Sequence, residues 1–154
     1  MILDELKRLE LDKNTIVVLL GDHGWALGEH TFWGKHTLFD RATHVPLIVR
    51  APGMETGRTE SMVSFVDLYP TLCELCELPQ PEGQLQGKSF VPVLKDTEAK
   101  VQEEVFIQWQ GGDNLVNDRN SYTEWVKKDK TSRMLFDHQE DEEENHNVAV
   151  QSQY

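Results

Sequence analysis

The feature that most limits how this chain can fold is a short apolar run that ends in a polar, glycine-rich loop. The run is TIVVLL, Thr15 to Leu20, and the loop after it begins GDHG, Gly21 to Gly24. A β-branched run that is apolar at every position is typical of a strand buried on both faces of a sheet. The pattern predicts an α/β fold in which Asp22 and His23 follow a central strand directly.

The remaining pattern predicts two parts, one at residues 1–100 and one at residues 101–154. The first has a second buried-strand candidate, THVPLIVRAPG, which Pro52 and Gly53 end. The second carries alternating or aromatic runs typical of a small antiparallel subdomain with an acidic tail. The expected elements are helices at about 2–11 and within 64–78, and short strands at 105–110, 121–126 and 132–138.

The charge of the chain excludes several classes of partner. With 27 acidic and 15 basic residues, the formal net charge is −12. This balance argues against nucleic acid or an anionic membrane as partner. No apolar run approaches the roughly 20 residues of a membrane span. An anionic substrate would therefore need a local positive site.

Asp22 and His23 are candidate metal ligands at the end of the first predicted strand. Ligands in open α/β sheets bind beyond the carboxyl ends of the strands, where loops converge. A carboxylate oxygen and an imidazole nitrogen both suit a divalent cation, and the flanking glycines allow close approach. A strand-end Asp is also typical of a helix or turn cap, so the spacing leaves both interpretations open.

Lys35 and the nearby tryptophans are candidate substrate contacts. The Lys35 ammonium could bind an anionic oxygen and stabilise charge that develops on it, although a surface lysine has the same sequence context. Trp25 and Trp33 could line a sugar or aryl pocket, or could pack in the core as most tryptophans do.

These residues lie in a segment that resembles the sulfatase family. NTIVVLLGDHGWALGEHTFWGKHTLFDRATHVPLIVRAPG, residues 14 to 53, is similar to the second half of a sulfatase, especially of the iduronate-2-sulfatase-like branch. The resemblance continues through VDLYPTLCELCELPQPEGQLQGKSFVPVL and into RMLFDHQEDEEENHNVA, which looks like the family's closing D-x-x-x-D-x-x-E-x-x-N segment. It implies an alkaline-phosphatase-like, mostly parallel sheet, present here in part, with a small C-terminal antiparallel subdomain.

The resemblance also implies roles for single residues. Asp22 and His23 would be two ligands of the calcium ion that binds the sulfate group. Lys35 would contact a sulfate oxygen and help to stabilise the leaving group, and Trp25 would contact the substrate, for example a sulfated glycan. The cation and the lysine would together supply the positive field that an acidic protein needs for an anionic substrate.

One family feature is absent from these 154 residues. Sulfatases use a formylglycine made from the Cys or Ser of a C/S-x-P-x-R motif, and no such motif occurs here; Cys73 and Cys76 lack the Pro and Arg. We therefore expect the chain to be the C-terminal part of a sulfatase, inactive alone, with the N-terminal half of the domain as its partner.

Two alternatives stay open at this stage. One is a metal-dependent phosphoesterase or phosphomutase of the same superfamily, and the other is a non-catalytic fragment or binding module. The family's habit implies an exported, periplasmic or lysosomal protein.

Overall fold

The chain divides into two units, each of which combines segments that are distant in the sequence. The structure, a computed structural model, describes residues 1–54 and 56–150. Unit 1 consists of Met1–Leu20 and Pro46–Val101, and unit 2 consists of Gly21–Val45 and the chain from Gln102 onward. The boundary near residue 100 that the sequence suggests stays a prediction. No helix within the described residues is long and apolar enough to cross a membrane.

The two predicted buried strands are neighbours in unit 1. They are β1 (Val17–Leu20) and β4 (Leu47–Arg50), and they pair with Val18 opposite Val49. The pair is antiparallel, and so is every other strand pair among the described residues, so the expected parallel sheet has no pair here. A parallel pair needs a crossover that returns the chain to the same end of the strand; the segment between β1 and β4 instead leads into β4 in the opposite direction.

One apolar face of this strand pair, which carries Leu19 and Ile48, is open in the described chain. The exposed fraction is 64% for Leu19 and 59% for Ile48. The sequence predicted strands covered on both faces, whereas within the described residues only the face of Val18 and Val49 is half-buried. Helix α1 (Ile2–Arg8), which precedes the pair, buries none of its residues.

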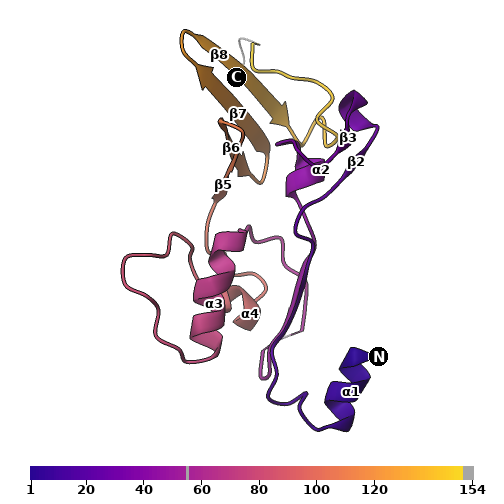
Figure 1. Cartoon of the computed structure of the whole chain (residues 1–154), viewed down its shortest axis with the longest axis vertical. Helices are drawn as coiled ribbons and strands as arrows, with labels where there is room; N and C mark the ends of the chain where they lie inside the picture. Colours follow the sequence, from indigo (N-terminus) through magenta and orange to yellow (C-terminus); the bar gives the residue numbers. More distant parts are fainter. Residues whose placement is uncertain (55, 151–154) are drawn as a thin grey trace. The chain divides into compact units, whose positions relative to one another are not determined.

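The core of unit 1 forms around the helix predicted within residues 64–78. A 3-10 turn, η2 (Phe65–Asp67), leads into α3 (Leu68–Leu75), and Ser64 with Asp67 forms a capping box at its start. The buried Asp67 carboxylate also accepts the Lys88 backbone N–H at 2.8 Å. This bond brings in α4 (Val91–Lys95), which lies beside α3 in Figure 1 and adds buried Val91 and Val93 to the core.

Unit 2 contains a four-stranded antiparallel meander in the order β5-β6-β7-β8. Three of its strands follow the runs predicted from the sequence, and β6 was missed because GGDNLVN is polar and rich in glycine. Positive φ angles at Gln110 and Gly111 form the tight turn that joins β5 to β6. The strands are β5 (Glu104–Trp109), β6 (Gly112–Asn117), β7 (Asn120–Lys127) and β8 (Lys130–Asp137).

The buried face of this sheet is partly polar. Asn114 is fully buried, and its amide lies within hydrogen-bonding distance of the Ser121 and Thr123 hydroxyls on β7. A Cβ at Gly112 would lie 2.9 Å from Leu38 Cδ1, so the segment before α2 (Asp40–Thr43) packs directly on the sheet. The small residues of β6 and β7 therefore make room for the first segment of unit 2.

Candidate functional site

The candidate site lies in the first segment of unit 2, immediately after β1. The side chain of Asp22 is 84% exposed and that of His23 is 28% exposed. His23 Nδ1 lies 2.7 Å from the Gly24 carbonyl oxygen. A carbonyl only accepts hydrogen bonds, so Nδ1 carries a proton. The Lys35 ammonium, which only donates, faces Nε2, so Nε2 presents its lone pair.

The Nε2 lone pair points into a small group of charged side chains. Lys35 Nζ lies 2.5 Å from His23 Nε2, and Asp22 Oδ2 lies 3.5 Å from the same nitrogen. Lys35 Nζ and the Asp22 carboxylate are therefore at most about 6 Å apart, the sum of these two distances. The structure thus brings together the three residues that the sequence singled out, within reach of one small anion or cation.

A β-hairpin places Lys35 opposite the loop. Its strands are β2 (Ala26–Leu27) and β3 (Trp33–Gly34), with Ala26 paired to Gly34 and Leu27 to Trp33. Side chains alternate between the two faces of a strand. Ala26 is 3% exposed, whereas Leu27 and Trp33 are 63% and 72% exposed, so small residues face inward and large apolar ones outward.

The outward face of the hairpin continues toward the charged group. Trp25 is 51% exposed, and its ring centroid lies 5.9 Å from that of His23. Lys35 follows Trp33 by two residues, which is the spacing of side chains on one face of an extended chain. An apolar surface of Trp25, Leu27 and Trp33 therefore adjoins the polar group of Asp22, His23 and Lys35.

Helix α2 holds the loop by its backbone. The Gly24 N–H donates to the Ala42 carbonyl at 2.8 Å, and a Cβ at position 24 would lie 2.0 Å from the Arg41 carbonyl oxygen. Only glycine permits this approach. The sequence motif GDHG thus has a second glycine because the loop lies directly on α2.

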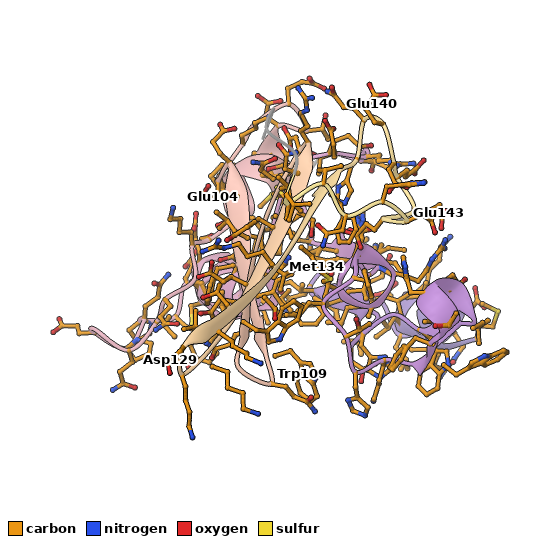
Figure 2. All side chains as sticks on the ribbon, turned by 90° about the horizontal axis from the view of Figure 1, so that it is seen from above. Glu104, Trp109, Asp129, Met134, Glu140 and Glu143 are labelled. Atoms are coloured by element: carbon orange, nitrogen blue, oxygen red, sulfur yellow. The ribbon has the colours of Figure 1, made fainter. Side chains whose placement is uncertain are left out.

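The segment after β8 binds α2 from the other side. The Glu144 carboxylate accepts the Asp40 N–H at 2.8 Å, and Glu143 forms an ion pair with Arg41 that raises the pKa of this guanidinium. In Figure 1 the C-terminal segment passes α2, and Figure 2 labels Glu140 and Glu143 on it. The sequence predicted an acidic tail here and missed these contacts, because they join residues about 100 positions apart.

The acidic residues of this closing segment are bound within the fold. Asp137 is 2% exposed and accepts three hydrogen bonds from Nε and Nη2 of the Arg119 guanidinium. Burial raises the pKa of Asp141, but backbone hydrogen bonds from Asn145 and His146 outweigh it, so the pKa is lowered overall. Asn147 accepts the Leu135 N–H and donates to the Arg133 carbonyl, which fastens the segment to β8. These contacts indicate a structural role for the acidic run.

The described residues contain no group of three or more His, Cys, Asp or Glu side chains arranged to hold a metal ion. Asp22 and His23 therefore fit a cation only as part of a larger ligand set. Cys73 and Cys76 lie in or next to α3 of unit 1 as free thiols, the first buried and the second exposed. Neither belongs to the charged group around His23.

Residues 28–154 match a family model described as N-sulphoglucosamine sulphohydrolase, C-terminal. The chain belongs to this sulfatase family. The matched residues include Lys35 and begin after His23.

Comparison with single proteins agrees with this assignment. Over 106 residues the chain is 40% identical to iduronate 2-sulfatase of Mus musculus, an alignment that spans 52% of this chain and 19% of that protein. A solved phosphonate monoester hydrolase of Agrobacterium radiobacter is 26% identical, with a TM-score of 0.85 over 99% of this chain and 34% of that one. A structure in complex with its substrate D-glucosamine-2-N,6-O-disulfate has the same fold, with 22% identity and a TM-score of 0.82 over 99% of this chain and 33% of that one.

The sulfatase-family chain thus has the predicted alkaline-phosphatase-like fold and the small antiparallel C-terminal sheet. It spans about a fifth of the mouse enzyme and about a third of each solved structure. Relatives of this kind therefore contain considerable polypeptide beyond the region that corresponds to this chain.

Proposed function

We propose that this chain forms one wall of the active site of a calcium-dependent sulfatase that cleaves sulfate esters. The observation that carries the proposal is the convergence of Asp22, His23 and Lys35 at the His23 Nε2 lone pair. In this proposal Asp22 and His23 are metal ligands, and Lys35 binds a sulfate oxygen. The ammonium stabilises the charge that develops on the leaving oxygen as the S–O bond breaks.

The donor set around His23 fits a cation in part. Asp22 offers an exposed carboxylate, and the Gly24 carbonyl at Nδ1 orients the His23 ring so that Nε2 faces the charged group. Calcium takes six to eight ligands, most of them oxygens, so the remaining ones come from outside this pair. When bound, calcium would neutralise sulfate oxygens and so make the sulfur easier to attack.

Lys35 and a cation compete for the same lone pair. Nε2 has one lone pair, so it either accepts from Lys35 or ligates a metal. If His23 and Asp22 held a metal, the Lys35 ammonium would be free to bind an anion at the same place. The positive charge needed by a protein of net charge −12 is thereby concentrated where the sulfate binds.

The apolar surface of Trp25, Leu27 and Trp33 supports a substrate with a ring beside its sulfate group. Aromatic side chains pack on the apolar faces of rings, and this surface adjoins the polar group. We assign Trp25 to this contact because its ring is the one placed next to His23. The name of the mouse relative, iduronate 2-sulfatase, and the disulfated glucosamine in a solved relative favour a sulfated sugar.

The nucleophile of the proposed reaction comes from outside this chain. No C/S-x-P-x-R motif occurs in its sequence, and neither cysteine lies in such a context. A formylglycine would therefore be supplied by the N-terminal half of a sulfatase domain, whose strands would also cover the open face of β1 and β4. The chain alone is then inactive, and the complete protein is exported, periplasmic or lysosomal.

The test is sulfate binding by a complete sulfatase that contains this sequence, with and without calcium, followed by NMR of the Lys35 side chain. We expect sulfate to shift the Lys35 signals only when calcium is present, and the Asp22→Asn variant to lose this effect. Asp129→Asn is the matched control, because Asp129 lies at the exposed turn between β7 and β8. If sulfate shifted the Lys35 signals equally with and without calcium, and equally in Asp22→Asn, the role of Asp22 and His23 as metal ligands would be rejected.

Activity provides a second test with an aryl sulfate and calcium. We expect no phenol release from the chain alone. Turnover that survives purification and disappears in Asp22→Ala would show that the nucleophile lies within these residues.

A second candidate function is hydrolysis of phosphonate or phosphate monoesters. It is favoured by the likeness to the phosphonate monoester hydrolase, with its TM-score of 0.85. This candidate would be favoured if phosphonate displaced sulfate from the calcium-loaded complete protein at a concentration much lower than that of the sulfate.

A further inference from the structure

Glu144 is a buried carboxylate in the segment after β8. It is 3% exposed, and both of its oxygens are used: Oε2 accepts the Asp40 N–H at 2.8 Å, and Oε1 lies 2.9 Å from His138 Nε2. Burying a carboxylate costs several kcal/mol unless hydrogen bonds replace its water. The two bonds account for its burial and tie it to a helix 104 residues earlier in the chain.

The Asp40 N–H is a donor that α2 cannot satisfy by itself. The first N–H groups of a helix have no partner within it, and Phe39, the residue before α2, offers no side-chain cap. Glu144 supplies the acceptor, and the neighbouring Glu143 pairs with Arg41. Two consecutive glutamates therefore fix where this four-residue helix lies.

The position of α2 in turn determines the position of the His23 loop. Gly24 donates to the Ala42 carbonyl, and its Cα lies so near the Arg41 carbonyl that no Cβ fits between them. The Gly24 carbonyl then holds His23 Nδ1. A shift of α2 is thus transmitted through backbone contacts to the imidazole that faces Lys35.

We propose that Glu144 is a positioning residue of the candidate site: through α2 and Gly24 it sets the place and the tautomer of His23. The functional meaning of this proposal rests on the proposed sulfatase site, but the geometric claim does not. It is therefore tested without sulfate, metal or activity.

The experiment measures hydrogen exchange of single backbone amides and the imidazole ¹⁵N shifts of His23 in the 154-residue chain. In Glu144→Ala, Gly24 exchange should rise by roughly tenfold or more, the effect of losing one hydrogen bond to a charged group. The His23 shifts should move toward a mixture of tautomers. Amides of β7 and β8 should stay within about twofold of the wild type, since their ladder does not use Glu144. Glu140→Gln, on the same segment and exposed, is the control and should change neither readout.

A second pair of variants removes the donor and keeps Glu144. Asp40→Pro deletes the N–H at the first helical position, where proline is well tolerated, and Phe39 already has the extended ψ of 148° that a following proline requires. Asp40→Asn keeps the N–H and controls for the carboxylate. We expect Asp40→Pro, but not Asp40→Asn, to reproduce the Gly24 and His23 changes.

Two results would overturn the proposal. Unchanged Gly24 exchange in both Glu144→Ala and Asp40→Pro would show that α2 is held without this bond. A uniform rise across Gly24, β7 and β8 would show that Glu144 serves overall stability. Neither result bears on sulfate binding, so the proposed function would stand or fall separately.

Discussion

Replacing Gly24 by alanine tests the packing of the candidate loop on α2. The new Cβ would lie 2.0 Å from the Arg41 carbonyl oxygen and 2.9 Å from its carbon, both backbone atoms that no rotamer change can move. The loop must therefore withdraw by about an ångström, which breaks the 2.8 Å bond from Gly24 to Ala42.

The cost of this substitution follows from two effects. The lost hydrogen bond is worth about 1 kcal/mol, and forcing an added carbon into a packed contact costs about 1–3 kcal/mol. We expect the free energy of unfolding of unit 2 to fall by about 2–4 kcal/mol, a large part of the 5–15 kcal/mol typical of a domain.

The assay is urea denaturation followed by circular dichroism of the chain. Gly111→Ala is the matched control, because it lies in the same unit and a Cβ there meets nothing within 4 Å. Its φ of +74° gives a cost of about 1–2 kcal/mol from backbone strain alone. If Gly24→Ala unfolds at the same urea concentration as Gly111→Ala or the wild type, the inferred close approach of Gly24 to the Arg41 carbonyl is contradicted.

Three further predictions concern the site, the sheet and the open strand pair. In a complete sulfatase that contains this sequence, Lys35→Ala should lower kcat/KM by roughly 10²-fold, as for the loss of one oxyanion donor; an unchanged value would make Lys35 a bystander. Hydrogen bonds from Arg133, and to a lesser extent from Tyr122, lower the pKa of Glu124. The ionised carboxylate therefore stabilises the sheet at pH values above the unfolded pKa of about 4.3. This stabilisation is lost as the pH falls through the lowered pKa of the folded state. The free energy of unfolding should therefore fall less steeply with decreasing pH in Glu124→Gln than in the wild type. The same pH dependence in both proteins would contradict this prediction. Replacing Leu19 and Ile48 by serine should reduce self-association in sedimentation experiments, because both side chains are mostly exposed; equal association would place the contact elsewhere.

The sequence predicted local elements well where one segment decides its own structure. The strand Val17–Leu20 follows from a β-branched apolar run, and the helix Leu68–Leu75 lies within the predicted range 64–78. The polar strand β6 was not predicted, because its buried positions are Gly112 and Asn114, which form no apolar pattern. Their place in the sheet depends on their partners in β7.

The candidate site was predictable in its members but not in its support. Asp22, His23 and Lys35 stand out by chemistry and spacing, and their convergence requires only that the hairpin of β2 and β3 folds back. The bond from Asp40 to Glu144 joins positions 104 residues apart, and no local pattern distinguishes that glutamate from its acidic neighbours. The roles of Asp22 and His23 as metal ligands and of Lys35 as a catalytic lysine stay predictions.

The connections within unit 2 explain why the loop after β1 belongs with the C-terminal segment. The chain leaves unit 1 at Leu20, and the next residues are held by bonds from Gly24 to α2 and from α2 to Glu144. None of these bonds involves β1. The order of the His23 imidazole therefore depends on the folding of the closing segment, and substitutions far from Asp22 in sequence can disturb the candidate site while leaving the β1–β4 pair intact.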